Sequence, residues 1–400
     1  MPAALPPPAA DNRLASIDAY RGFVMLLMMA EIVHLPALAE QFPDSPFWQA
    51  VKFHTTHVEW AGCSLHDLIQ PSFSFLVGVA LPFSLAARAA RGQSLGRMAG
   101  HALWRGALLT FLGVFLRSVG RPRTNFTFED TLSQIGLGYP LLFLLGLRAR
   151  WVQFVALAAI LVGYWGLFAA YPLPGPEFDY EAVGEDGEWQ SRHAYQGFAA
   201  HWNKNSNPAW AFDTWFLNLF PREAPFTHNG GGYATLSFLP TLATMILGLL
   251  AGGVLREARS ARKKLAWLAV SGIVCLASGW ALDYFGICPS VKRIWTPAWA
   301  LFSGGWCYLL LAGFYLLLDA SGRQKLAFPL AVIGANSIAI YCLVHLIEGF
   351  IVESFRTHLG QGVFQALGTD YESQLAGLAA LAVFWLLLLW MYRRKIFIRV

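Results

Sequence analysis

Apolar residues in this chain come in blocks of about 20, the length that a helix needs to cross roughly 30 Å of hydrocarbon. Hydrophobic residues make up 56% of its 400 residues and charged residues only 13%. An ordinary soluble domain has about 25% charged residues, so this composition is not that of a soluble protein. The pattern predicts an all-α fold, a polytopic integral membrane protein.

Ten of these blocks are predicted to span the membrane. They lie near residues 18–36, 65–87, 100–117, 131–147, 151–171, 236–255, 264–285, 299–318, 326–350 and 374–392. The Pro/Ala-rich residues 1–12 precede them and are expected to form a disordered tail. Residues 13–400 are expected to form a single transmembrane domain.

The distribution of Lys and Arg predicts the orientation of these spans. An even number of spans places both termini on one side, and the short segments on that side hold most of the basic residues, for example REARSARKK (256–264) and YRRKIFIRV (392–400). Short basic segments face the cytoplasm, so both termini are predicted to be cytoplasmic. The net charge of +5 is therefore a topology signal, and no nucleic-acid partner is expected.

The same orientation places residues 172–235 outside the cytoplasm. Unstructured loops of this length are uncommon, so an extracytoplasmic folded cap is predicted. Its tryptophans Trp202, Trp210 and Trp215 have two readings. They could stack on sugar rings, or they could anchor the cap at the headgroup level, as interfacial tryptophans commonly do.

Several kinds of chemistry have no support in the sequence. The five cysteines are scattered and show no CxxC spacing, so no metal site is expected. Whether Cys63 and Cys288 pair is open. The chain also has no Walker loop, dinucleotide-binding glycine motif, GxSxG elbow or HExxH motif, which argues against an ATP-driven pump and the corresponding hydrolases.

Polar residues stand at the start of the second predicted span, in HVEWAGCSLHDLIQP (57–71). A helical face of small and polar residues is predicted here, formed by Ser64, Asp67, Pro71, Ser74 and Gly78 at three- and four-residue steps. A carboxylate at such a position is costly and needs a partner.

His57 lies ten residues before Asp67, so the two can meet only if the chain bends, and Gly62 permits a bend. A His–Asp pair sets the tautomer and basicity of an imidazole, which suits acid–base catalysis. The alternative is that His57 is an ordinary polar residue at the membrane surface.

A second polar face is predicted in the ninth span, GANSIAIYCLVHLIE (334–348). It comprises Asn336, Tyr341, His345 and Glu348. Such a face either forms a hydrogen-bonded network between helices or lines a polar cavity.

The chain resembles the transmembrane acyltransferases related to heparan-alpha-glucosaminide N-acetyltransferase. The resemblance runs over about residues 13–400 through short motifs in the same order. The matching residues are Arg13, Ser16, Asp18, Arg21 and Gly22 in the first span; His57, Trp60, Gly62, Asp67, Leu68 and Pro71; Leu132, Gln134 and Gly136; Pro289, Lys292, Trp295 and Thr296; and Gly334, Asn336, Ser337 and Tyr341.

The resemblance implies an enzyme that takes acetyl from cytoplasmic acetyl-CoA and delivers it to a glucosamine amine across the membrane. It implies His57 as the catalytic residue, and Asp67 is expected to orient it. The residues expected to line the substrate or acetyl-CoA cavity are Trp60, Gln134, Lys292, Trp295, Asn336, Ser337, Tyr341 and His345. The resemblance further implies a homodimer in contact with lipid, in a bacterial inner membrane.

The sequence departs from the family at residues 231–234, which read GGYA where the lysosomal enzymes have Asp-Pro-Glu-Gly. Free glucosamine or a short amino sugar is therefore expected as acceptor rather than heparan. His57 would act as a base on the acceptor or as a nucleophile that carries the acetyl group. Two other functions remain open: an amino-sugar permease without chemistry, and an O-acyltransferase acting on a cell-envelope polymer.

Overall fold

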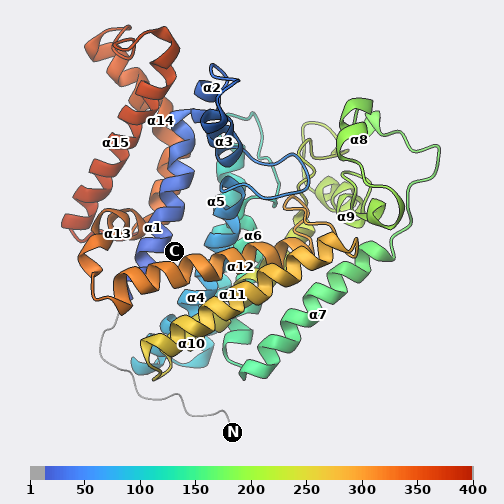
Figure 1. Cartoon of the computed structure of the whole chain (residues 1–400), viewed down its shortest axis with the longest axis horizontal. Coiled ribbons are helices and arrows are strands. Elements are labelled where there is room, and N and C mark those ends of the chain that lie inside the picture. Colours follow the sequence, from blue (N-terminus) through green and yellow to red (C-terminus); the bar gives the residue numbers. More distant parts are fainter. Residues whose placement is uncertain (1–13, 399–400) are drawn as a thin grey trace. The chain divides into compact units, whose positions relative to one another are not determined.

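The computed structural model describes residues 14–398, and the regular elements in this part of the chain are all helices (Figure 1). The long ones are α4 (Ile69–Ala90), α5 (Leu95–Ser118), α7 (Arg150–Ala169), α10 (Phe238–Arg256), α11 (Ala261–Tyr284), α12 (Pro297–Phe314), α14 (Ser337–Leu359) and α15 (Glu372–Arg393). Shorter ones are α1 (Ala15–Met29), α6 (Thr131–Gly146) and α13 (Phe328–Gly334). The predicted disordered tail, residues 1–12, lies outside the described residues.

Eight helical segments of the described chain are long and apolar enough to cross a membrane. These segments contain the eight long helices named above. The apolar helices Thr131–Gly146 and Gln324–Gly334 are shorter. The chain is thus an all-helical, multi-pass membrane protein, as its composition predicts.

The predicted ninth span, 326–350, is not one helix. Helix α13 ends at Gly334 and α14 begins at Ser337, so the break falls at Ala335 and Asn336. The backbone of Asn336 leaves the helical region, with φ −129° and ψ 38°. Apolar composition continues through the break, which is why hydropathy alone merged the two helices.

The predicted first span, 18–36, also ends differently. Helix α1 ends at Met29, and a 3₁₀ turn, Ala30–Val33, continues it. His34 then takes a left-handed backbone conformation with φ 51°, and the short α2 (Leu35–Ala39) starts in a new direction. A single residue in this conformation cannot continue a right-handed helix.

The chain divides into two compact units. The first unit comprises residues 59–62 and 70–312, and the second comprises residues 14–58, 63–69 and 313–398. Cys63, in the second unit, and Cys288, in the first, are both free thiols.

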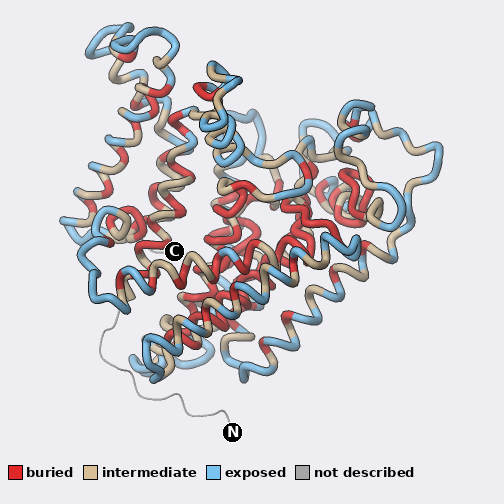
Figure 2. The backbone as a smooth tube through the Cα atoms, viewed as in Figure 1, coloured by how far each residue is buried: buried red, intermediate tan, exposed pale blue. Residues whose placement is uncertain are grey.

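Helix α10 is the buried centre of the first unit (Figures 1 and 2). Glycines let α4 and α10 approach each other backbone to backbone. A Cβ on Gly78 would lie 1.9 Å from the Met245 carbonyl oxygen, and one on Gly252 would lie 2.2 Å from that of Val79. Such close approach is typical of helix pairs in membranes, where small residues rather than hydrophobic exclusion hold helices together.

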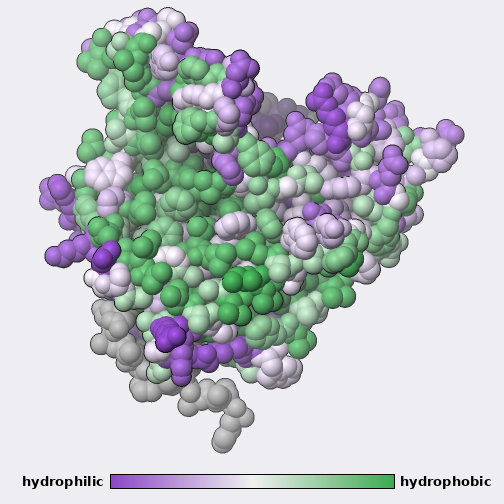
Figure 3. Space-filling model, in the orientation of Figure 1, coloured by the Kyte–Doolittle hydropathy of each residue, from purple (hydrophilic) through white to green (hydrophobic). Residues whose placement is uncertain are grey.

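The surface of the first unit separates by polarity (Figure 3). Helix α11 exposes apolar side chains such as Val270, Ile273 and Val274, which suits contact with lipid. The segment 172–235 is more hydrophilic and folds into short helices, among them α8 (Gly187–His193) and α9 (Pro208–Phe216).

The second unit is built around α1. Helix α13 packs closely on it, and a Cβ on Gly22 would lie 1.8 Å from the Leu330 carbonyl oxygen. Helices α14 and α15 pack against each other, and Gly377 of α15 lies against the backbone of Ile32 (Figure 1). This packing brings the end of α1 next to α14 and α15, where the candidate site lies.

Candidate active site

His57 and Asp67 meet in the second unit. His57 follows the short helix α3 (Pro46–Thr55), and Asp67 lies in the 3₁₀ turn His66–Leu68 that leads into α4. The chain between them folds back through Gly62, whose φ of 115° is readily available only to glycine. His57 Nδ1 lies 2.8 Å from Asp67 Oδ1.

The carboxylate of Asp67 is fully buried and held by several donors. Its Oδ2 accepts hydrogen bonds from the backbone amides of Ser64, at 3.0 Å, and Val58, at 3.3 Å. The Ser64 hydroxyl lies 3.0 Å from the same oxygen and 2.6 Å from the Thr56 carbonyl oxygen, so its single hydrogen is shared between two acceptors. These donors stabilise the negative charge and fix the carboxylate's orientation.

This arrangement determines which ring nitrogen of His57 carries the reactive lone pair. An ionised carboxylate only accepts, so the hydrogen in the 2.8 Å contact belongs to Nδ1 of His57. The neutral ring then carries its lone pair on Nε2, the nitrogen suited to take a proton or attack a carbonyl carbon. The His57 side chain is 39% exposed, whereas Asp67 is 0% exposed. A buried carboxylate behind an accessible imidazole is an arrangement suited to acid–base catalysis.

A second histidine–carboxylate pair stands beside the first. The ring centres of His57 and His66 are 4.3 Å apart. His66 Nε2 lies 3.1 Å from Oε1 of Glu31, which is in the 3₁₀ turn after α1. The sequence gave no sign that His66 and Glu31 pair, because 35 positions of chain separate them.

Glu31 also borders a polar pocket of about 470 Å³ in the second unit. The polar side chains in its lining come from the turn after α1 and from α14. They are Glu31, His34, His345 and Glu348. A pocket of this size is within the range that small-molecule ligands occupy.

The ninth-span candidates occupy two different places. Tyr341 and His345 lie on α14 with stacked rings, 4.7 Å between centres, and His345 Nδ1 is 2.8 Å from the Tyr341 carbonyl oxygen. Asn336 precedes this helix and binds the C-terminal segment through Ile396 and Ile398. The hydroxyl of Ser337 donates to the Gly334 carbonyl and closes the break before α14. The single face predicted from Asn336 to Glu348 therefore excludes its first member.

The remaining candidates lie in the first unit and are buried. Gln134 donates to the carbonyl oxygens of Phe128, Ala234 and Thr235. Trp295 Nε1 donates to the Thr244 hydroxyl at 3.1 Å. Hydrogen bonds that join segments far apart in the chain are typical of structural polar residues.

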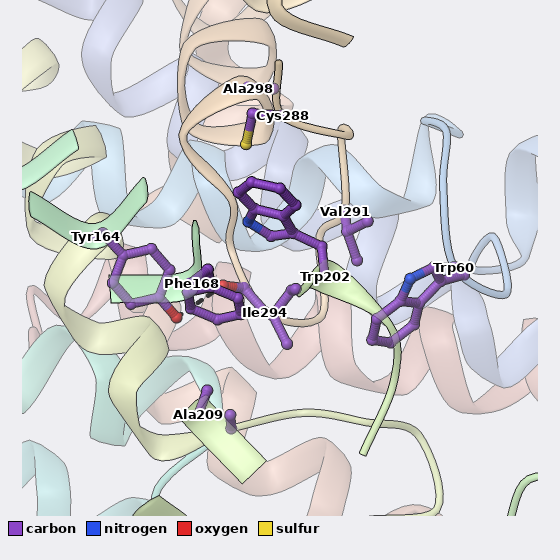
Figure 4. Packing of buried hydrophobic residues seen from close by; sticks show 10 residues of the cluster. Trp60, Tyr164, Phe168, Trp202, Ala209, Cys288, Val291, Ile294 and Ala298 are labelled. Atoms are coloured by element: carbon purple, nitrogen blue, oxygen red, sulfur yellow. Dashed lines mark hydrogen bonds between the residues drawn. The ribbon is translucent and has the colours of Figure 1, made fainter. Parts of the chain in front are cut away.

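Lys292 and Trp60 are nearly inaccessible, with exposures of 4% and 1%. Trp60 belongs to a cluster of buried apolar residues together with Trp202, Phe168 and Tyr164 (Figure 4). The side chain of Trp202 is 0% exposed, so it neither stacks on a sugar ring nor anchors the cap at the headgroup level. Trp215, in contrast, is 61% exposed.

The 172–235 segment holds two buried carboxyl groups with altered acidity. Burial raises the pKa of Glu185 to about 8, against the opposing effect of the nearby Lys204 ammonium. Burial likewise raises the pKa of Asp213 to about 7, although the Thr235 amide donates to it at 2.9 Å. Both groups gain charge near neutral pH, so this segment is sensitive to pH.

The fold and this geometry define a class of protein: a multi-pass α-helical membrane protein with a buried carboxylate oriented toward an accessible histidine. No family model matches the chain. It is similar to human heparan-alpha-glucosaminide N-acetyltransferase, with 23% identity over 435 residues that cover 98% of this chain and 60% of the human protein.

The Mus musculus protein of the same name is 20% identical over 425 residues, which cover 96% of this chain and 60% of that protein. The chain is thus a distant relative of these N-acetyltransferases, as the motifs predict. It spans about 60% of the length of the relatives it matches.

Proposed function

We propose that the chain is a membrane acetyltransferase that transfers acetyl from acetyl-CoA to the amine of glucosamine or of a short glucosamine-containing sugar. The 2.8 Å contact between His57 Nδ1 and the buried Asp67 carboxylate carries this proposal. Both relatives are named heparan-alpha-glucosaminide N-acetyltransferase, which supports the choice of acetyl transfer and of an amino sugar.

His57 acts at the amine nitrogen or at the acetyl carbon. As a base, its Nε2 takes a proton from the attacking amine and returns it to the leaving sulfur. As a nucleophile, Nε2 itself accepts the acetyl group and passes it to the amine. In both routes the acetyl carbon loses its bond to sulfur and ends bonded to nitrogen. Asp67 positions the ring and stabilises the imidazolium that forms.

The proposed topology has both termini in the cytoplasm, where the basic segments lie, and the 172–235 segment on the opposite side as a cap. Acetyl-CoA reaches the enzyme from the cytoplasm and the amino sugar from the other side. A homodimer in a bacterial inner membrane, in contact with lipid, is part of this proposal.

Among the cavity candidates, Tyr341 and His345 are proposed to contact substrate, because His345 borders the polar pocket and stacks on Tyr341. Asn336 and Ser337 are proposed to hold the break before α14. Trp60, Gln134, Lys292 and Trp295 are proposed to support the first unit, because all four are buried.

The test is acetyl transfer by the purified protein in detergent, with labelled acetyl-CoA and glucosamine. We expect labelled N-acetylglucosamine from the wild type, and loss of about 100-fold or more in His57→Ala, since a positioned acid–base group contributes about 10²–10⁴-fold. The matched control is His358→Ala, which removes an exposed histidine at the end of α14.

The alternatives give different results. Equal product from the wild type and His57→Ala would keep the enzyme and remove His57 from its chemistry. Acetyl-CoA turnover without an N-acetylated sugar would point to an O-linked polymer acceptor. If the protein neither binds nor consumes acetyl-CoA, the acetyltransferase proposal fails, and sugar uptake into vesicles is the next assay.

A further inference from the structure

Acetyl transfer to an amino sugar must handle two protons. At neutral pH the acceptor is largely an ammonium ion, because its acidity is close to that of an α-amino group, about 7.7–8.0. One proton must leave before nitrogen can attack. A second N–H proton must leave as the amide forms, and it ends on the sulfur of coenzyme A. The His57–Asp67 pair accounts for one of these transfers.

We propose that His66 and Glu31 form a second acid–base pair, which binds the acceptor's ammonium group at the polar pocket and removes its first proton. This inference rests on the proposed function. Three observations within the second unit carry it. His66 Nε2 lies 3.1 Å from Glu31 Oε1, and the ring centres of His66 and His57 are 4.3 Å apart. Glu31 also lines the pocket of about 470 Å³.

The pocket has the chemistry that a cationic amine requires. Two carboxyl groups, those of Glu31 and Glu348, border it, and the imidazoles of His34 and His345 add hydrogen-bonding groups suited to sugar hydroxyls. Neither Lys nor Arg is among its lining residues. Opposite charge within a partly enclosed site attracts the ammonium ion more strongly than it would in water.

Burial separates the roles of the two carboxylates that face the neighbouring imidazoles. The side chain of Glu31 is 54% exposed and that of Asp67 is 0% exposed. Glu31 can therefore touch substrate and solvent, whereas Asp67 can only orient His57. The exposed Glu31 carboxylate suits exchange of a proton with water, whereas the accessible ring in the other pair is that of His57, at 39% exposed against 10% for His66.

The proton balance follows from the tautomers. Glu31 lines the pocket and contacts the ammonium ion, and it passes the first proton to the lone pair of His66 Nε2, 3.1 Å away. That proton leaves to solvent through Glu31, which is 54% exposed. Its departure removes the positive charge that would oppose an imidazolium at His57, whose ring centre lies 4.3 Å away. The neutral amine then attacks, its C–N bond forms, the C–S bond breaks, and His57 carries the second proton to sulfur. One proton is released for each amide formed.

Several titratable groups lie near the His66–Glu31 pair or around the pocket that Glu31 lines. On neighbouring elements of the second unit these are Glu31, His57 and Asp67, with His34, His345 and Glu348 around the pocket and His54 at the amide of Leu65. Variants of His66 and Glu31 must therefore be compared with variants of His57 over the same pH range.

The experiment measures kcat/KM for glucosamine from pH 6 to pH 9 in the wild type, His66→Gln, Glu31→Gln and His57→Ala, all as full chains in detergent. At pH 6 we expect about a 100-fold loss in His66→Gln and a smaller loss in Glu31→Gln. At pH 9 the acceptor is already a neutral amine, so both variants should come within about threefold of the wild type. His57→Ala should stay impaired at every pH.

The matched control is Glu40→Gln, which removes an exposed carboxylate of the same unit that pairs with Lys52 at 2.9 Å. A loss in His66→Gln that is the same at all pH values would indicate a structural role and overturn the proposal, as would unchanged kinetics in both variants. If the wild type itself makes no N-acetylglucosamine, the proposed function fails and the second pair's role fails with it. Normal wild-type activity with a pH-independent defect overturns the second pair alone.

Discussion

Gly248 of α10 lies directly against the backbone of Phe75 in α4, and a Cβ at this glycine would stand 1.9 Å from the Phe75 carbonyl oxygen. No rotation of a side chain relieves a clash with backbone. We expect Gly248→Ala to push α4 and α10 apart and to lower the unfolding temperature in detergent by several degrees or more, since overpacking costs about 1–3 kcal/mol.

Gly253, on the same helix, is the control, because its nearest neighbour to an added Cβ would be the Arg150 side chain at 3.8 Å. Gly253→Ala should be neutral or slightly stabilising, as alanine favours a helix. Equal thermal shifts for the two variants would contradict the close packing of α4 on α10.

The hydrogen bonds to Asp67 predict a graded series of kinetic defects. Asp67→Asn replaces an acceptor with a group that can present N–H to His57 Nδ1, so the ring loses its orientation and kcat should fall about 100-fold or more. Ser64→Ala removes one contact of the carboxylate and leaves the amide donors of Ser64 and Val58, so about a tenfold loss is expected.

The measurement for this series is kcat for N-acetylglucosamine formation, with KM for both substrates. A larger defect in Ser64→Ala than in Asp67→Asn would reverse the expected order and count against Asp67 as the positioning group. Ser354→Ala, which removes a hydroxyl bonded within α14 to the Phe350 carbonyl, should leave kcat unchanged.

Asn336 joins the break before α14 to the end of the chain. Its Nδ2 donates to the Ile396 carbonyl at 3.0 Å, and its Oδ1 accepts from the Ile398 amide at 2.9 Å. We expect Asn336→Ala to release the C-terminal segment, so that trypsin cuts after Arg393–Lys395 several times faster than in the wild type. Unchanged cleavage kinetics would show that other contacts hold this segment.

The raised pKa of Glu185 predicts that the stability of the fold depends on pH. Its pKa is raised by burial from 4.5 to about 8, so between these values the folded chain keeps a proton that the unfolded chain has lost. The free energy of unfolding therefore falls as pH rises from about 5 to about 8, and this contribution levels off above that range.

Glu185→Gln should remove this part of the pH dependence, because an amide does not titrate. The measurement is the unfolding temperature in detergent at pH 5, 7 and 9 for the wild type, Glu185→Gln and the control Glu188→Gln. Glu188 is exposed and pairs with Arg192. If the difference between the wild type and Glu185→Gln is constant over this range, Glu185 does not titrate between these values.

The sequence allowed much of the helical framework to be predicted, for a simple reason. A segment that crosses hydrocarbon must be apolar over its whole length and must satisfy its backbone hydrogen bonds internally, so composition and length reveal it. The prediction was wrong at 326–350, where α13 and α14 are separate helices. The break there depends on hydrogen bonds from Asn336 to residues some 60 positions away, which leave no trace in local hydropathy.

For the candidate site, the sequence marked His57 and Asp67 because a histidine and a carboxylate are costly at a membrane boundary, and Gly62 permitted the bend between them. It also grouped Trp60, Gln134 and Trp295 with them as cavity candidates, but these side chains are buried among structural contacts. A residue type and its spacing do not say whether a polar group faces a cavity or a carbonyl oxygen.

The sequence by itself thus determined the membrane class, most of the helices and the His57–Asp67 contact, since these depend on composition and on residues only ten positions apart. Only the tertiary structure decided that His66 meets Glu31 and that Glu31, His345 and Glu348 share one pocket. Those residues come from segments that the packing of α1 and α14 brings together. Contacts between distant segments depend on how whole helices pack, which no local pattern of residues records.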